Sequence, residues 1–266
     1  MSESQVPSEI GIAVAELRSA SIFLTRVPPR YLGASAAAVP DFRHAARVFP
    51  VVGALVGLVG GVVLVVADLL NIPAMVGAAL AVSATVILTG GLHEDGLADA
   101  ADSLGGSTTE KKLAIMDDSR VGTYGALALI LSVVIRITAL GALAVVVGSV
   151  RAGLVLIAAE AVSRASMVRL WHDLPAARMG GLSNDTGAPD QNAMLIAIAA
   201  AAAIAVIVAL PAVGLWPTIL AGAFAVVATY VVIRVTARTL GGRTGDTLGA
   251  CQQVAVAAFL IGASVV

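Results

Sequence analysis

The chain has 266 residues, of which 59% are hydrophobic and 12% are charged. Soluble domains carry roughly twice this charged fraction, so the composition excludes a soluble enzyme and a disordered tail. Lys and Arg (16) nearly balance Asp and Glu (17), which excludes the basic surface field of a nucleic-acid binder. A single cysteine, Cys251, rules out intrachain disulfides and Cys-rich metal sites.

The first 48 residues carry too many charges to cross a bilayer. Within them, residues 9–25 alternate apolar and polar side chains at roughly helical spacing, which predicts a helix lying along the membrane surface. We therefore expect residues 1–48 to form a cytoplasmic and interfacial segment that precedes the membrane bundle.

Long apolar runs alternate with short polar breaks over the rest of the chain. A run of about 20 residues crosses the hydrocarbon core as a helix. Runs of this kind predict seven transmembrane helices, at 50–69, 73–91, 124–148, 151–170, 192–211, 215–233 and 247–265. The predicted fold is all-α: residues 1–266 form a single membrane domain, with the bundle at 49–266 and an acidic cytoplasmic loop at 92–122 that carries the active-site helices.

The basic residues predict the orientation, because Lys and Arg near the ends of spans stay on the cytoplasmic side. They concentrate in the N-terminal segment and in the breaks after the second, fourth and sixth spans, whereas the opposite breaks carry only Arg151. The N-terminus and the long polar loops are therefore expected in the cytoplasm.

Seven of the seventeen acidic residues fall within residues 93–118. Asp95, Asp99 and Asp102 are spaced i, i+4, i+7, which places their carboxylates on one face of a helix. No basic residue is interleaved to relieve their repulsion, and Mg²⁺ would relieve it, so we expect a metal site that includes the adjacent Glu94. A solvated acidic loop is the alternative. The neighbouring His93 is either a metal ligand or proton acceptor, or an interfacial histidine without a catalytic role.

Two further polar elements stand beside spans. Asp118 and Arg120 precede the third span, where Asp118 either completes the metal site or caps a helix, and Arg120 contacts a phosphate. Before the last span, Asp246 either contacts substrate or caps the span, and the Gln252 amide should face protein or a polar cavity because it lies inside an apolar run.

Three ionisable residues lie inside predicted spans. Glu160 and Arg164 are i, i+4 neighbours, so they either pair with each other or leave Arg164 free to reach a phosphate. Arg136 lies deeper in its span, and the sequence assigns it no role. The cytoplasm-facing carboxylates on a scaffold of several spans indicate metal-assisted phosphoryl transfer.

Five strings carry a resemblance to a known family: FLTRVP (23–28), RVFPVVGALVG (47–57), GGLHEDGLADAADSLGG (90–106), IMDDSRVGTYGALAL (115–129) and GGRTGDTLGACQQ (241–253). They resemble the cobalamin synthase (adenosylcobinamide-GDP ribazoletransferase) family, in family order and over nearly the whole chain. The resemblance implies that adenosylcobinamide-GDP and α-ribazole, or its 5′-phosphate, give adenosylcobalamin, or its 5′-phosphate, and GMP, with Mg²⁺ required. The ribazole 3′-hydroxyl would attack the phosphorus that bears the aminopropanol arm.

The resemblance also implies roles for the residues named above. Mg²⁺ would be held by Asp95, Asp99, Asp102 and Asp118, with Glu94 nearby. The proton acceptor would be Asp118 or Asp102 ahead of His93. The substrates would be contacted by Arg120, Lys111, Arg243, Asp246, Gln252, Arg164 and Arg26.

The implied location is the cytoplasmic (inner) membrane of a bacterium or archaeon, with the lipid bilayer and the two small-molecule substrates as partners and no nucleic acid. A homo-oligomer and a complex with other cobalamin-assembly enzymes both stay open. A CDP-alcohol phosphotransferase that makes phospholipid is the first alternative function, although this chain has Ala98-Asp99 where that signature has Ala-Arg. A membrane carrier of cations or corrinoids is the second.

Overall fold

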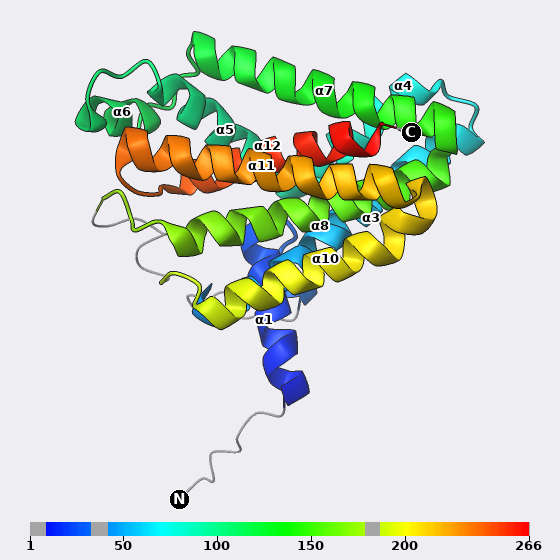
Figure 1. Cartoon of the computed structure of the whole chain (residues 1–266), viewed down its shortest axis with the longest axis horizontal. Helices are drawn as coiled ribbons and strands as arrows, with labels where there is room; N and C mark the ends of the chain where they lie inside the picture. The colour runs from blue at the N-terminus through cyan, green and yellow to red at the C-terminus, as the bar shows by residue number, and fades with distance from the viewer. Residues whose placement is uncertain (1–8, 33–41, 179–186, 266) are drawn as a thin grey trace, which may run out of the picture.

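The computed structural model describes residues 9–32, 42–178 and 187–265. These residues form helices and no strand; a single isolated bridge joins Ala176 to Arg243. The helices run in the order α1 (Glu9–Leu24), η1 (Pro29–Leu32), α2 (Phe42–Ala45), η2 (Ala46–Val48), α3 (Phe49–Leu69), α4 (Ala74–Thr89), α5 (Leu92–Ser103), α6 (Thr109–Met116), α7 (Thr123–Val147), α8 (Ser149–Asp173), α10 (Gln191–Val213), α11 (Leu215–Leu240) and α12 (Gly245–Ala263). The all-α prediction is confirmed (Figure 1).

Among the described residues, five helical segments are long and apolar enough to cross a membrane: 42–69, α7, α10, α11 and α12. A sixth is added if α4 and α5, which meet at 90°, are counted as one broken span. Seven spans were predicted, and these criteria of length and composition give five or six. The predicted span 73–91 is a helix of only 16 residues, and 151–170 lies in α8, whose charges at Arg151, Glu160, Arg164 and Arg169 set it apart from the apolar spans.

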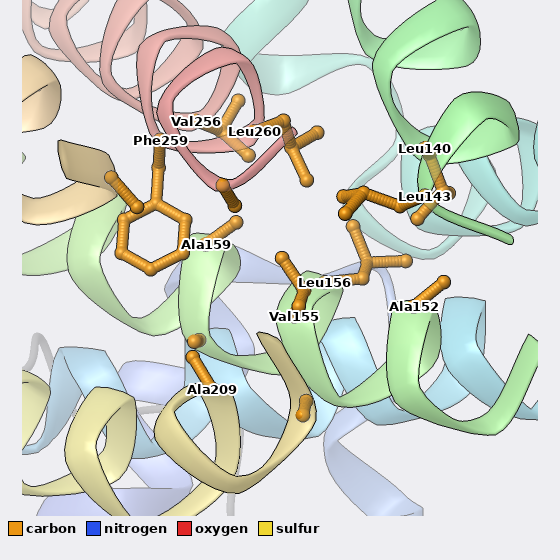
Figure 2. Close-up of a cluster of buried hydrophobic side chains, with 14 of the residues drawn as sticks. Leu140, Leu143, Ala152, Val155, Leu156, Ala159, Ala209, Val256, Phe259 and Leu260 are labelled. Carbon is orange, nitrogen blue, oxygen red and sulfur yellow. The ribbon is translucent and has the colours of Figure 1, made fainter. Parts of the chain in front are cut away.

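Helix α8 is the central element of the bundle and packs against α3, α10 and α12. Glycines at every fourth position of α3 allow its backbone to touch α8: a Cβ on Gly57 would lie 2.6 Å from the Ile157 Cα, and Gly61 meets Gly153. Such small residues are typical of close helix packing in membranes. Figure 2 shows the apolar core beside this contact, where Leu156 of α8 meets Leu140 of α7 and Leu260 of α12.

Helix α6 lies at one end of the bundle (Figure 1). The first residues of α7, α10 and α12 lie at this end, as do the last residues of α8 and α11. The polar breaks that were predicted to share one side of the membrane therefore meet at one end, here called the α6 end. Lys111, Arg120, Arg178 and Arg238 all belong to these breaks or to the last turns before them.

The N-terminal segment contains the predicted helix, α1, which extends away from the bundle (Figure 1). Its second half is anchored by Phe23, whose ring packs with those of Phe42, Phe49 and Trp171. Its first half is exposed and includes Ile10, which is 78% exposed. The predicted surface location of α1 stays a prediction, and the parts of the expected 1–48 segment at 1–8 and 33–41 lie outside the described residues.

Candidate active site

A double glycine turn places the acidic helix. Gly90 and Gly91 both have positive φ angles, 67° and 70°, a conformation that other residues avoid, and they turn the chain through 90° from α4 into α5. The Arg26 backbone N–H donates to the Leu88 carbonyl at 2.8 Å, and the Arg26 side chain covers Gly90. Arg26, predicted to contact substrate, thus lies exposed at the corner where α5 begins.

Helix α5 contains the three predicted carboxylates, which confirms that they belong to one helix. Asp95 is exposed and Asp99 is partly exposed, and the Asp99 carboxylate is repelled by Asp95, Asp102 and Asp246. The last of these comes from the first turn of α12, so the structure adds Asp246 to the acidic stripe. We call Asp95, Asp99, Asp102 and Asp246 the carboxylate cluster.

Two glycines bring α12 this close to α5. A Cβ on Gly96 would lie 2.8 Å from the Asp246 carbonyl oxygen, and a Cβ on Gly249 would lie 3.3 Å from the Gly96 Cα. The helices therefore touch backbone to backbone. A capping box formed by Thr244 and Thr247 starts α12 at this point, so Asp246 is held in the first turn beside α5.

Asp102 has a partner that the sequence did not reveal. Its two carboxylate oxygens accept hydrogen bonds from the backbone N–H groups of Gly122 and Gly125, at 2.7 and 2.9 Å. These donors belong to the start of α7, so Asp102 caps that helix and satisfies its free N–H groups. A side chain at Gly122 or Gly125 would collide with the carboxylate. Asp102, predicted as a metal ligand or proton acceptor, is thus bound to the backbone of α7 on both oxygens.

The loop before α7 carries a second charged group. The Arg120 guanidinium donates to both oxygens of Asp118, at 3.0 and 2.6 Å, and this hydrogen bonding holds the pKa of Asp118 below its usual range. The neighbouring Asp117 accepts a hydrogen bond from Arg178 at 2.5 Å, which likewise lowers the pKa of Asp117. Asp118 therefore pairs with Arg120 and is not bound to the carboxylate cluster.

An open hollow of about 430 Å³ lies beside this loop. It is lined by the Gly105-Gly106 turn after α5, by Lys111 of α6 and by Asp118. Two predicted site residues, Lys111 and Asp118, thus share one hollow at the α6 end, next to the exposed Arg120. The Lys111 ammonium also lies 3.3 Å from the Ser107 hydroxyl.

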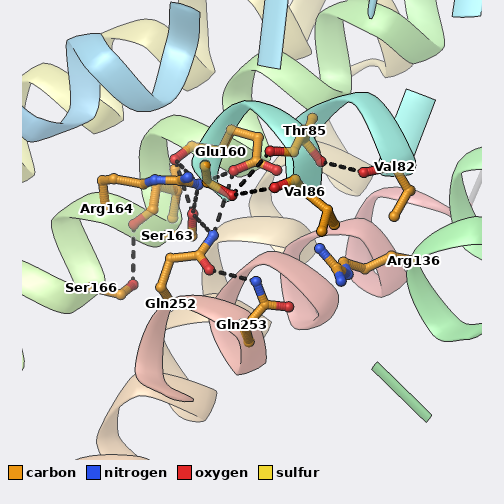
Figure 3. A network of polar contacts seen from close by, with 12 residues as sticks. Val82, Thr85, Val86, Arg136, Glu160, Ser163, Arg164, Ser166, Gln252 and Gln253 are labelled. Carbon is orange, nitrogen blue, oxygen red and sulfur yellow. Dashed lines mark hydrogen bonds and ion pairs between the residues drawn. The ribbon is translucent and has the colours of Figure 1, made fainter. Parts of the chain in front are cut away.

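A second group of predicted residues lies in the bundle interior, in the network drawn in Figure 3. Arg164 pairs with Glu160, which confirms the pairing alternative for these two residues. The Gln252 amide donates to Ser163 Oγ at 3.0 Å and accepts from the Gln253 amide at 2.8 Å. Arg164 and Gln252, predicted to contact substrate, are therefore buried among protein groups.

Glu94 belongs to the same interior network. It accepts hydrogen bonds from Arg136 at 3.1 Å and from the Gln253 amide at 2.9 Å. The adjacent His93 is buried, and its Nε2 has no hydrogen-bond partner within the described part of the chain. Neither side chain joins the carboxylate cluster, so the structure separates Glu94 and His93 from the three aspartates with which they were predicted to act.

Arg243 is also internal. Its backbone N–H donates to the Pro175 carbonyl at 2.8 Å, its own carbonyl accepts from the Ala177 N–H at 2.9 Å, and its guanidinium donates to the Leu174 carbonyl. Arg243 therefore holds the turn before α12 against the end of α8, although it was predicted to steady a pyrophosphate.

The donor set can be tested against Mg²⁺. Within residues 9–32, 42–178 and 187–265, no three His, Cys, Asp or Glu side chains converge closely enough to enclose an ion. Mg²⁺ is usually bound by one or two carboxylates, with water and substrate phosphates as its other ligands. Asp95 and Asp99 fit this mode, because they are mutually repelling carboxylates that water can reach.

Comparisons with known proteins place the chain in one enzyme family. A family model described as cobalamin-5-phosphate synthase matches residues 16–264. The adenosylcobinamide-GDP ribazoletransferase of Azorhizobium caulinodans is 39% identical over 264 residues, 98% of this chain and 97% of the relative. The protein of the same name from Brucella melitensis is 41% identical over 218 residues, 82% of this chain and 84% of the relative. No solved structure gives a significant match. These findings do not support the lipid-synthesis and carrier alternatives, and the chain belongs to the cobalamin-5-phosphate synthase family.

Proposed function

We propose that this protein joins adenosylcobinamide-GDP to α-ribazole, or to α-ribazole 5′-phosphate, with release of GMP. The product is adenosylcobalamin or its 5′-phosphate, so the reaction assembles the nucleotide loop of the cofactor. The observation that carries this proposal is the family match over residues 16–264, supported by relatives that share the transferase name along most of the chain.

The reaction is a displacement at phosphorus. The 3′-hydroxyl oxygen of the ribazole forms a bond to the phosphorus that bears the aminopropanol arm, and the bond from that phosphorus to the bridging oxygen of the pyrophosphate breaks. GMP departs with the bridging oxygen, and a carboxylate takes the hydroxyl proton. Asp118 is our first choice for this acceptor, since it lines the open hollow at the α6 end. Asp102 is our second choice for the proton acceptor, and His93 is our third.

Basic side chains near the hollow would bind the pyrophosphate. Arg120 is 87% exposed and presents a planar guanidinium that can bind two phosphate oxygens at once. Lys111 lines the same hollow and adds a positive charge. Both groups would be expected to neutralise charge that accumulates as GMP departs.

We also propose that the reaction requires Mg²⁺ and that Asp95 and Asp99 bind it, with Asp246 beside them. When bound, Mg²⁺ would neutralise charge on the pyrophosphate. The support is chemical: these carboxylates repel one another, and the α5 stripe has no interleaved basic residue.

We place the protein in the cytoplasmic (inner) membrane, with the N-terminus and the α6 end in the cytoplasm. The support is the concentration of basic residues in the breaks that meet at the α6 end, since basic loops are retained in the cytoplasm. A second copy of the chain and other cobalamin-assembly enzymes are the protein partners to test by purification from native membranes.

The test is direct. Protein purified in detergent should release GMP from adenosylcobinamide-GDP when α-ribazole and Mg²⁺ are present, and EDTA should stop the release. Asp95→Asn and Asp99→Asn should each abolish release without loss of folded protein. Asp173→Asn is a matched control, because Asp173 pairs with Arg169 at the end of α8, and it should leave the rate unchanged. Absence of GMP above a mock preparation, with both substrates intact, would refute the proposal.

A further inference from the structure

The proposed reaction gives no role to the ion pair between Arg136 and Glu94. Arg136 lies near the middle of α7 with its side chain only 3% exposed, and its guanidinium donates to Glu94 of α5, whose side chain is 13% exposed. A buried charge is costly unless it is paired, so the two residues require each other. Nε and Nη2 of Arg136 have no partner among the described residues, so within this part of the chain the hydrogen bond from Nη1 to Glu94 holds the side chain in place.

Glu94 joins α5 to both of the helices beside it. The same carboxylate oxygen accepts from Arg136 of α7 and from Gln253 of α12. The Gln253 amide is held in turn by Ser132 of α7, whose hydroxyl donates to it at 3.1 Å. Glu94 is thus fixed from two directions, and a rotation of α5 about its axis would break both hydrogen bonds.

The closest approach of α5 to α12 lies two residues further on. Gly96 lies against the backbone of Asp246, and Gly249 lies against the backbone of His93 and Gly96, so neither glycine has space for a Cβ and these contacts set the distance between the helix axes. The atoms in contact belong to the backbone, so no interlocked pair of side chains at this point resists rotation. Successive helix residues differ in direction by about 100°, so the direction of Glu94 also sets the direction of Asp95.

We propose that Arg136 is a positioning residue, which through its ion pair with Glu94 sets the rotation of α5 and so aims Asp95 and Asp99 toward Asp246. This inference rests on the proposed function for the purpose of the carboxylates, and it adds a residue that contacts none of them. Arg136 acts in the middle of the bundle on a group of side chains at the α6 end.

Binding of Mn²⁺, a paramagnetic substitute for Mg²⁺, tests the inference without turnover. The affinity is measured by electron paramagnetic resonance on protein in detergent, for the wild type, Arg136→Met, Arg136→Lys and the double variant Glu94→Gln with Arg136→Met. Loss of a group that orients metal ligands weakens binding by about 10- to 100-fold, and we expect this for Arg136→Met. Arg136→Lys retains a cation that can donate to Glu94 and should bind within about threefold of the wild type. Arg151→Met, at an exposed site on α8, should have no effect.

The double variant separates positioning from charge compensation. The double variant removes both charges of the ion pair. If the pair served only to stabilise the fold, both the thermal stability and the Mn²⁺ affinity of the double variant would return to the wild-type level. Positioning predicts that thermal stability returns while Mn²⁺ binding stays weak, because the direction of Glu94 is no longer held. Wild-type affinity in the double variant, or in folded Arg136→Met, overturns the inference. If Arg136→Met does not fold, the inference is tested with the other two variants. It stands if Arg136→Lys binds Mn²⁺ within about threefold of the wild type and the folded double variant binds it weakly, and it is overturned if the double variant binds as the wild type does.

GMP release measured on the same preparations keeps the two proposals apart. A wild type that binds Mn²⁺ and releases no GMP refutes the proposed function and leaves the affinities to decide the role of Arg136. A wild type that releases GMP and binds no Mn²⁺ overturns the role of Arg136 and leaves the proposed function standing.

Discussion

Replacement of Asp102 by alanine distinguishes capping from metal binding. The carboxylate accepts two backbone N–H groups at the start of α7, at 2.7 and 2.9 Å, and alanine leaves both donors without a protein acceptor. Loss of a helix cap costs about 0.5–2 kcal/mol, and hydrogen bonds to a charged group contribute about 1.5–3 kcal/mol each. Water reaches this partly exposed site and compensates in part, so we expect Asp102→Ala to lower the free energy of unfolding by about 2 kcal/mol.

The neighbouring aspartates predict a change of opposite sign. In protein freed of metal by EDTA, Asp95→Asn and Asp99→Asn relieve repulsion within the carboxylate cluster. Relief of like charges at helical spacing is worth a few tenths of a kcal/mol, so each variant should be as stable as the wild type or slightly more stable. If Asp102 served only as a metal ligand, its removal would follow the same pattern.

Unfolding is measured by circular dichroism in mixed micelles as the SDS fraction is raised, with EDTA present throughout. Asp102→Asn retains one acceptor oxygen and should fall between the wild type and Asp102→Ala. Gly125→Ala, which places a methyl group against the Asp102 carboxylate, should destabilise the protein through the same contact. An Asp102→Ala protein at least as stable as the wild type would show that the capping bonds do not support α7.

Three further substitutions test the bundle and the hollow. Glu160→Ala leaves the buried Arg164 without its ion-pair partner and should cost about 3–5 kcal/mol, read by the same SDS titration. Gly57→Val forces α3 away from α8 and should lower the yield of folded protein in size-exclusion chromatography, whereas Gly222→Ala, with open space around it, should not. Arg120→Lys loses two-point phosphate binding and should slow GMP release about tenfold with unchanged stability, because its pair is exposed.

Patterns within one helix were predictable from the sequence, whereas contacts between helices were not. The i, i+4, i+7 spacing of Asp95, Asp99 and Asp102 is a property of one helix, and α5 contains all three. Whether a carboxylate faces water, a cation or a backbone N–H depends on the element packed against it. Asp102 binds backbone N–H groups because the start of α7 packs against it. Asp246 belongs to the carboxylate cluster because the first turn of α12 packs against α5.

Some of these contacts did leave a signal in the sequence. Gly96 and Gly249 interrupt polar segments at points where no turn occurs, which indicates close backbone approach of another element. An arginine in the middle of an apolar run requires a partner, and Glu94, just after the Gly90-Gly91 break, was available for Arg136. The number of spans depends on packing in the same way: length and hydropathy give five or six and leave out α8, whose charges at Glu160 and Arg164 pair with each other inside the bundle.

The interior network also explains how a nearly neutral chain can maintain an acidic site. Glu94 and Glu160 are matched by Arg136 and Arg164, so the buried charges compensate one another inside the bundle. Asp117 and Asp118 are matched in the same way by Arg178 and Arg120. Among the described residues, negative charge that has no ion-pair partner is left on α5 and the first turn of α12, where Asp95 and Asp99 repel each other. A cation would be drawn to this position even though the whole chain has a net charge of −1.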